Sequence, residues 1–343
     1  MTTALNTLFI TTEGTRLNKQ GECVVVTVHD EKKAEVPLRH LRSVVCLARA
    51  WLTPELLESC VEAGIHVAFF GTTGRFLARV EGLPGGNVLL RRQQYRAADD
   101  PVRTLALSRA LVVGKVANAR HFLLHARRDA AVERQALLSD AAHRLTGHLR
   151  ALERADDLDQ VRGLEGIAAR EYFDAFPLLL KAEASGFTFE GRNRRPPRDP
   201  LNALLSFGYA LLMQDCAAAL AGVGLDPAVG FLHEDRPGRL SLALDLMEEF
   251  RTPVVDRLVF SMVNRGQLKP EDFRTEAAGA VLLRDEARKS FLVAYQAAKQ
   301  GAVRHLFLEQ DTHWGTAPHL QALLLARTLR GELDTYPPFA VHG

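Results

Sequence analysis

The chain has 343 residues, 47% of them hydrophobic, and a formal net charge of +2 at pH 7, which is an ordinary globular composition. No apolar run reaches the roughly eighteen residues that span a bilayer, and the N-terminus lacks a signal-peptide core. Four scattered cysteines without a CxxC pair argue against a zinc ribbon or a disulfide framework. We therefore expect a cytoplasmic protein of two domains that does not contact a membrane.

The N-terminal part of the chain alternates in the manner of β-strands. The segments LNTLFITT, GECVVVTV and HLRSVVCLA are rich in Val, Thr and Leu, and NKQGE predicts a turn between two of them. One short helix is expected after them, with Thr53 as its N-cap, Pro54 as its first residue and Gly64 at its end. The segment HVAFFGTTGRFLARVEG then returns to strand character.

The segment GLPGGN at residues 82–87 predicts a domain boundary, because glycine and proline interrupt regular structure. From Val88 onward the apolar residues follow a helical period, and strand patterns are nearly absent. The first long amphipathic helix is marked by Leu105, Leu107, Leu111, Val112, Val116 and Ala119. The predicted fold class is α+β, with a small β-rich N-terminal domain over residues 1–86 and a larger all-helical domain over residues 87–343.

The stretch VGFLHEDRPGRLSLALDLMEEFR at residues 229–251 holds the main candidates for chemistry. His233 precedes a Pro-Gly loop, and Asp245, Glu248 and Glu249 follow inside a run of leucines. On a helix these acids would flank an apolar stripe that faces the core, formed by Met247, Phe250, Val254 and Leu258. Acids beside a core need a cation, a basic partner or a hydrogen-bond network. Pairing with Arg251 or Arg257 satisfies this need, and so does an oxygen-rich Mg²⁺ or Mn²⁺ site that includes the histidine.

A further acid, Glu165, lies between Gly163 and Gly166 in RGLEGIAAREYF at residues 162–173. Small neighbours allow a bulky ligand to approach closely. The alternative is a glutamate in the first turn of a helix, where the helix dipole favours a negative charge. The residues alone leave both interpretations open.

Taken together, these motifs resemble the family of the CRISPR-associated integrase, numbered one in its series, the catalytic subunit of the spacer-acquisition complex. The resemblance runs essentially from end to end, in a shared order and spacing. It includes LNTLFITT, GRFLARVEG, GNVLLRRQQYR, RGLEGIAAREYF, GRNRRPPRDPLNALLSFGYALL, VGFLHEDRPGRLSLALDLMEEFRTPVVDR and LRGELDTYPPF. The segment RPGRLSLALDLMEEFR is most similar to type I-C members, whose operons also encode an iron–sulfur nuclease.

The resemblance implies that Glu165, His233 and Glu248 bind Mg²⁺ or Mn²⁺, with Asp245 as a nearby catalytic acid. It also implies a dimerising N-terminal domain and a helical catalytic domain. The implied reaction is transesterification, in which the 3′-hydroxyl of a foreign DNA fragment attacks a phosphodiester at the edge of a CRISPR repeat. Glu249, by contrast, is expected on a more exposed side of the helix.

The partners that the resemblance implies are double-stranded DNA (the incoming fragment and the repeat), a second copy of the chain, a small ferredoxin-like adaptation subunit and an iron–sulfur CRISPR nuclease. Two arginine-rich segments, RRQQYR at 91–96 and GRNRRPPR at 191–198, are by default solvated basic faces. The prolines of the second hold its arginines on a rigid loop suited to phosphate. The candidate DNA contacts are Arg91, Arg92, Arg194, Arg195 and Arg198.

Two other functions stay open from the sequence. A metal-dependent nuclease that cleaves branched DNA with water as nucleophile would use the same site residues. A DNA-binding scaffold without catalysis is disfavoured, because all four proposed site residues carry side chains able to bind a metal.

Overall fold

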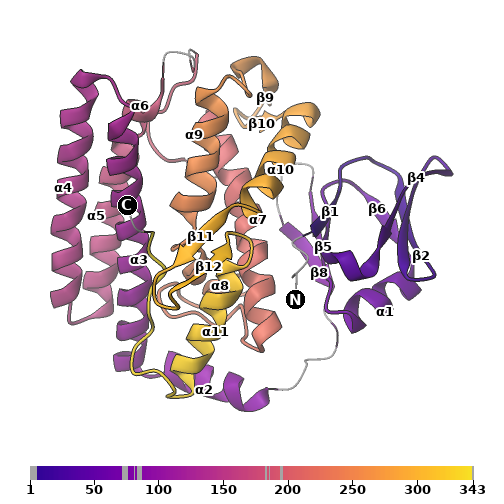
Figure 1. The fold of residues 1–343 in the computed structure, drawn as a ribbon, viewed down its shortest axis with the longest axis horizontal. Helices are drawn as coiled ribbons and strands as arrows, with labels where there is room; N and C mark the ends of the chain where they lie inside the picture. The colour runs from indigo at the N-terminus through magenta and orange to yellow at the C-terminus, as the bar shows by residue number, and fades with distance from the viewer. Residues whose placement is uncertain are drawn as a thin grey trace. The chain divides into compact units, whose positions relative to one another are not determined.

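The computed structural model describes residues 6–71, 76–80, 82, 87–181, 184, 186–193 and 196–341. The chain divides into two compact units (Figure 1). The first unit is Met1–Gly86 together with Arg288–Gln300, and the second is Asn87–Ala287 together with Gly301–Gly343. With 54% of residues helical and 17% in strands, the fold is mixed α and β, and its β-rich part comes first.

The first unit is rich in β-strands, as the alternating pattern predicts, and these strands form two four-stranded sheets. Their strands are β1 (Asn6–Ile10), β2 (Thr15–Gln20), β3 (Cys23–Val28), β4 (Glu31–Pro37), β5 (Leu41–Cys46), β6 (Ala50–Leu52), β7 (His66–Phe70) and β8 (Phe76–Val80). One sheet has the order β1-β5-β7-β8, parallel except for the β7–β8 pair. The other has the order β4-β3-β2-β6, antiparallel except for the β2–β6 pair.

The helix α1 (Pro54–Glu62) begins and ends where the sequence predicts. The Thr53 side chain accepts a hydrogen bond from the Leu56 N–H, Pro54 is the first helical residue, and Gly64 has a φ of +65°. Leu56 and Cys60 are buried in the apolar core that this unit forms with Leu17, Val24, Val44 and Val67. The predicted capping residues therefore set the helix that covers this core.

The second unit is mainly helical. Its long helices are α2 (Val88–Ala98), α3 (Pro101–Arg128), α4 (Val132–Arg154), α5 (Leu158–Asp174), α7 (Pro200–Val223) and α11 (Ala317–Leu329). Its shorter helical elements are α6 (Phe176–Leu179), α8 (Ser241–Met247), α9 (Arg257–Asn264) and the 3₁₀ turn η4 (Pro270–Asp272). The first unit has one 3₁₀ turn among its described residues, η1 (Leu38–His40). Figure 1 shows α3, α4 and α5 packed side by side. The helix α10 (Asp285–Lys299) lies mostly within the part that groups with the first unit.

The prediction of an all-helical second domain is wrong in one respect, because this unit also contains two antiparallel hairpins. Strand β9 (Phe273–Thr275) pairs with β10 (Val281–Leu283), and β11 (Ala302–His305) pairs with β12 (Gln310–His313). Strands of three or four residues are too short to produce a recognisable two-residue alternation. Their buried side chains, Phe273, Val281, Val303 and His305, pack against other parts of the chain.

The sequence predicted no segment long and apolar enough to span a membrane, and helix α7 corrects this expectation. By length and composition it is apolar enough to cross a membrane, but 61% of its most apolar window is buried inside the protein. Its buried residues, among them Leu204, Leu205 and Leu212, lie in the core of the second unit, and the helix packs against α8 and α11. A helix that is apolar on all sides is what a central core helix requires.

The chain from residue 241 to residue 264 is not the single helix that the apolar stripe suggested. Helix α8 ends at Met247, residues 248–250 form a turn, and a π-helical segment η3 (Arg251–Asp256) leads into α9. Pro253 lies within this π-helical segment, where it has no N–H to donate to the helical ladder. The stripe residues Met247, Phe250, Val254 and Leu258 are nevertheless all buried, as predicted.

The predicted boundary segment, residues 82–87, has only Gly82 and Asn87 among the described residues. The functional division of the chain at that segment stays a prediction.

Candidate functional site

The loop before α8 is organised by one buried carboxylate. Asp245, with none of its surface exposed, accepts hydrogen bonds from the backbone N–H groups of Phe231 (2.6 Å), Leu232 (3.1 Å) and His233 (3.0 Å). Its Oδ1 also lies 2.7 Å from Nδ1 of the His233 ring. Both oxygens of Asp245 are therefore engaged by the loop, and the acid fixes the position of the histidine.

Gly230 makes this close approach possible. A Cβ at this position would lie 2.9 Å from Oδ2 of Asp245 and 2.8 Å from Cβ of Ser241, closer than real side chains approach. The loop is further tied by the Ser241 hydroxyl, which donates to the Glu234 carbonyl at 2.9 Å. The sequence VGFLH thus needs glycine at this point so that the backbone can fold around Asp245.

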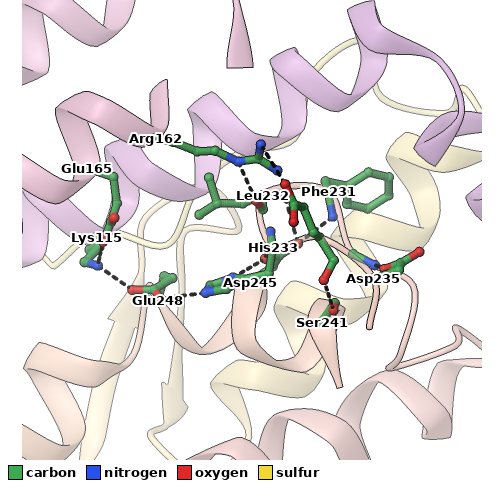
Figure 2. A network of polar contacts seen from close by, with 12 residues as sticks. Lys115, Arg162, Glu165, Phe231, Leu232, His233, Asp235, Ser241, Asp245 and Glu248 are labelled. Carbon is green, nitrogen blue, oxygen red and sulfur yellow. Dashed lines mark hydrogen bonds and ion pairs between the residues drawn. The ribbon is translucent and has the colours of Figure 1, made fainter. Parts of the chain in front are cut away.

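The ring of His233 points its other nitrogen toward Glu248. Nε2 of His233 lies 3.9 Å from Oε1 of Glu248, and Figure 2 shows this side of the ring facing the glutamate. Because Asp245 holds Nδ1, Nε2 is the nitrogen left to meet a ligand. This arrangement, a carboxylate behind a histidine, is the one that orients imidazole ligands in metal sites.

Glu248 is a buried acid with cationic partners. Its Oε1 lies 2.9 Å from Nη2 of Arg251, and its Oε2 lies 2.8 Å from Nζ of Lys115. Burial by itself would raise the pKa of this carboxyl, but Arg251, Lys115 and His233 together lower the pKa to about 2. Glu248 is therefore ionised at neutral pH, and the pairing with Arg251 anticipated from the sequence is present.

Glu165 reaches the same place from another helix. It lies in the middle of α5, not in the first turn, so the interpretation as a dipole-favoured first-turn acid is wrong. Its Oε1 contacts the ammonium of Lys115, the same group that faces Glu248. The two glycines beside it, Gly163 and Gly166, have open space around them and leave this part of the helix surface uncrowded.

The three predicted ligands thus approach one another from α5, the loop after α7 and the end of α8 (Figure 2). The ammonium group of Lys115 lies between Glu165 and Glu248. In the described part of the chain, no three His, Cys, Asp or Glu side chains are already close enough to share an ion. The donor set nevertheless fits Mg²⁺ or Mn²⁺: two ionisable carboxylates and one oriented imidazole nitrogen. In addition, Oε2 of Glu248 is buried and makes no hydrogen bond of good geometry.

A cavity of about 270 Å³ opens beside these residues. It is lined by Arg162, Glu165, Leu232, His233, Glu234, Arg236 and Arg239. Arg162 is anchored by a hydrogen bond of 3.1 Å from its Nε to the carbonyl of Leu232. Three guanidinium groups around an opening next to two candidate ligands form a concave surface suited to phosphate.

Glu249 does not lie on an exposed side, as was expected; none of its surface is exposed. Its carboxyl accepts hydrogen bonds from the Tyr336 hydroxyl (2.8 Å), the Phe339 N–H (3.0 Å) and the Gln321 amide (3.2 Å). Burial raises its pKa to about 8, although these three donors act in the opposite direction. The turn at residues 248–250 sends the two adjacent glutamates into different environments, which helix geometry could not predict.

The predicted DNA-contacting arginines have different placements. Arg92 and Arg198 are exposed, and Arg91 is partly exposed on α2. Arg194 and Arg195 lie outside the described residues. Their neighbour Arg192 turns inward instead, donating to Oδ1 of Asn202 at 2.6 Å and lying over the Tyr209 ring. Contact of these arginines with DNA stays a prediction.

Sequence reasoning missed Lys115 and the arginines of the cavity. Lys115 lies within the predicted amphipathic helix, between the buried residues Val112 and Val116. A lysine so close to core positions needs an acidic partner, and this was the available signal. The cavity arginines carried no such signal, because arginine is frequent throughout the chain.

Solved structures of other proteins share this architecture. A β-rich unit followed by a mainly helical unit is the fold of a Cas1 protein from Thermotoga maritima, with a TM-score of 0.82 at 23% identity over 98% of this chain and 100% of that one. The structure of a casposase bound to integration product matches with a TM-score of 0.81 at 22% identity, over 97% of this chain and 93% of that one. At these identities the likeness shows the fold alone.

The family follows from the sequence matches. The model of the family described as CRISPR associated protein Cas1 matches residues 8–297. A CRISPR-associated endonuclease Cas1 of Chlorobaculum tepidum is 47% identical over 336 residues, and one of Rhodospirillum rubrum is 49% identical over 340 residues. Each match covers 98% of both chains. The chain therefore belongs to the Cas1 family, as the resemblance of its motifs indicated.

Proposed function

We propose that this chain is a metal-dependent DNA integrase and endonuclease that inserts foreign DNA fragments into a CRISPR array by transesterification. The observation that carries the proposal is that Glu165 and Glu248 share the ammonium group of Lys115 while Nε2 of His233 faces Glu248. The curated relatives named endonucleases support phosphodiester chemistry. The fold is also shared with a casposase whose structure contains an integration product, which is in keeping with strand transfer.

In this proposal, Glu165, His233 and Glu248 hold one Mg²⁺ or Mn²⁺. A divalent ion bound there would polarise the phosphate and stabilise the charge that develops on the attacking and leaving oxygens. Asp245 does not take part directly, because both its oxygens are engaged by the loop. It keeps Nδ1 of His233 occupied so that Nε2 faces the ion. Arg251 holds Oε1 of Glu248 and keeps this carboxylate ionised.

The cavity next to the ligands is the proposed position of the DNA backbone. Arg162, Arg236 and Arg239 line it together with Glu165 and His233, so a phosphate bound by the guanidinium groups would lie beside the metal ligands. The chain's contribution to the reaction is then mainly positional. It holds a 3′-hydroxyl and the phosphorus of the repeat in line, while the arginines balance the phosphate charge.

We further propose that the chain acts as a homodimer through residues 1–86, with a small ferredoxin-like subunit and an iron–sulfur nuclease as partners, in the cytoplasm. A solved structure described as a Cas6-RT-Cas1–Cas2 complex matches with a TM-score of 0.82 at 25% identity, over 100% of this chain and 36% of that chain. A relative from Geobacter sulfurreducens, 36% identical over 339 residues, is an exonuclease Cas4/endonuclease Cas1 fusion; the match covers 97% of this chain and 60% of the fusion. These partners of relatives motivate the proposed assembly.

Strand-transfer assays with matched DNA ends separate this proposal from its alternatives. A short labelled duplex is incubated with a plasmid carrying a CRISPR repeat, the purified protein, the small partner subunit and Mn²⁺ or Mg²⁺. The matched control duplex ends in 3′-deoxynucleotides and therefore lacks the nucleophile. We expect joined products from the 3′-hydroxyl duplex only, and none with a chelator.

Two outcomes would contradict the proposal. Equal cleavage of the plasmid with both duplexes, without joined product, would identify water as the nucleophile and the protein as a nuclease. Binding of both DNAs with no joining or cleavage in either metal would identify a scaffold.

A further inference from the structure

The site contains a lysine to which the proposed reaction gives no role. Lys115 lies on α3, with only 14% of its side chain exposed, and its ammonium contacts Glu165 and Glu248 at the same time. These two acids come from α5 and from the turn after α8. A single ammonium therefore bridges two of the three proposed metal ligands.

We propose that Lys115 is an internal counter-cation of the metal site, which holds Glu165 and Glu248 in the metal-free protein and competes with the divalent ion for them. This inference rests on the proposed function, because it concerns the same ligands. It makes Lys115 a positioning residue, whose effect is exerted through the two carboxylates.

The charges of the cluster support this role. Glu165 and Glu248 carry two negative charges, and Lys115 and Arg251 supply two positive ones, so these four groups balance one another without a metal. A divalent ion added between the carboxylates would leave an excess of positive charge in a largely buried place, which is unfavourable. Movement of one of the two cations away from the carboxylates would relieve this excess.

The contacts indicate that Lys115 is the cation that moves. Arg251 occupies Oε1 of Glu248 and lies over the ring of Tyr209. Lys115 pairs with Oε2 of Glu248 without good hydrogen-bond geometry. Unlike Arg251, it also forms an ion pair with Glu165. Its flexible stem permits a change of rotamer that a stacked guanidinium does not.

There is space for the displaced ammonium. A cavity of about 30 Å³ lies next to Lys115, lined also by Tyr209, Arg251 and Asp256. The Asp256 carboxylate on its wall is a third acid near which the ammonium can remain inside the protein. The metal-free state thereby keeps buried Glu248 paired, and metal binding is weaker than the three ligands alone would give.

The test is a Mn²⁺ titration of the full-length protein, in which free Mn²⁺ is measured by electron paramagnetic resonance. The variants are Lys115→Met and Lys115→Gln, which remove the charge, and Lys115→Arg, which keeps it. Arg120→Gln is the matched control, because it removes a positive charge from the same helix at a residue that bonds Thr146 instead of the acids. Melting temperatures with and without Mn²⁺ give a second measurement on each variant.

We expect Lys115→Met and Lys115→Gln to melt at a lower temperature without metal, and to bind Mn²⁺ with a Kd at least about tenfold lower than the wild type. Lys115→Arg and Arg120→Gln should stay within about threefold of the wild type or bind more weakly. Equal or weaker Mn²⁺ binding by folded Lys115→Met and Lys115→Gln, beside a wild type that binds Mn²⁺, would refute the role of Lys115 alone. Absence of Mn²⁺ binding in all these proteins would instead refute the metal site, and the role of Lys115 with it.

Discussion

Single residues in this protein show how partners determine the state of a buried acid. Glu248 and Glu249 are adjacent and both buried, yet their pKa values are shifted in opposite directions, to about 2 and about 8. Both carboxyls are desolvated, which raises the pKa. Only Glu248 has cations beside it, and their attraction outweighs the burial. Glu249 has neutral donors, which offset burial only in part.

The proposed ligands are best tested by isosteric changes. Glu165→Gln, His233→Gln and Glu248→Gln should each reduce DNA joining by more than the roughly 10–100-fold typical of residues that only support metal ligands. Asp245→Asn should fall in that range, because it loosens the His233 loop without removing a ligand. Joining rates are compared with melting curves and DNA affinity for each variant. Near wild-type joining by Glu165→Gln or Glu248→Gln would remove that residue from the site.

Substitution of the buried Glu249 is expected to destabilise the fold. Glu249→Ala leaves the Tyr336, Gln321 and Phe339 donors without their acceptor, so we expect a loss of roughly 2–4 kcal/mol in unfolding free energy. Glu249→Gln retains an acceptor and should lose less. Urea unfolding at pH 7 measures both. An alanine variant as stable as the wild type would show that this network contributes nothing.

The sequence predicted which residues meet in the site better than it predicted what each one does. Acid and histidine spacing together with the family resemblance named Glu165, His233 and Glu248. The structure links the two glutamates through Lys115 and places His233 beside Glu248. The positions of Glu249 and Asp245 depend on the turn that ends α8 and on a loop folded around a carboxylate. Neither feature leaves a periodic trace in the sequence.

At the scale of elements, the π-helical segment η3 is the junction of the second unit. Its last residue, Asp256, is buried and accepts hydrogen bonds from Tyr172 of α5 at 2.8 Å and Tyr209 of α7 at 2.6 Å. One carboxylate therefore ties three elements next to the site. Asn118 of α3 adds a second tie, because its amide donates to the carbonyls of Glu249 and Phe339. These hydrogen bonds hold the irregular backbone between α8 and α9 in place. A regular helix would not need them.

The Asp256 junction predicts a pH dependence of stability. Burial raises the pKa of this carboxyl to about 6, although the tyrosines and arginines nearby lower it. The folded state then binds a proton more readily than the unfolded state between about pH 4 and pH 6. Protonation of Asp256 thus contributes roughly 3 kcal/mol to the free energy of unfolding below about pH 4, and this contribution is lost as the pH rises through 6.

Asp256→Asn should remove this dependence. Unfolding free energies of the wild type and Asp256→Asn, measured from pH 4 to pH 8, should differ in slope between pH 4 and pH 6 and run parallel above pH 7. Parallel curves over the whole range would mean that Asp256 does not change its protonation on folding.

Elements were predictable where the pattern is long. The strands β1, β3, β5, β7 and β8, the capped helix α1 and the long helix α3 follow from alternation, capping and helical period, whereas β2, β4 and β6 were not predicted. The hairpins β9–β10 and β11–β12 and the π-helical segment were not predicted. Each is short and is determined by contacts with distant parts of the chain, which outweigh local preference.

At the scale of the whole molecule, the two units suggest a division between assembly and chemistry. All the site residues lie in the second unit. The first unit has an exposed aromatic residue on an edge strand: Trp51, 74% exposed, on β6. An edge strand with an exposed tryptophan is a natural surface for association. Residues 288–300 group with this unit, so a fragment beginning at Asn87 would lack the partner of that helix.

We therefore test dimerisation on the full chain. Trp51→Glu should shift the protein toward monomer in sedimentation velocity, because it places a charge in the proposed interface. Leu323→Glu, at a 41% exposed residue of α11 in the second unit, is the control and should stay dimeric. The assignment of self-association to the β6 edge fails if Trp51→Glu sediments as the wild type does.

The central claim is that Glu165, His233 and Glu248 share one divalent ion. Anomalous diffraction at the manganese edge, from crystals grown with Mn²⁺, tests it most directly. We predict one strong peak roughly 2.0–2.3 Å from an oxygen of each glutamate and from Nε2 of His233, with the ammonium of Lys115 withdrawn from both carboxylates. A map with no peak at this position at saturating Mn²⁺, and with Lys115 still between Glu165 and Glu248, would contradict the account.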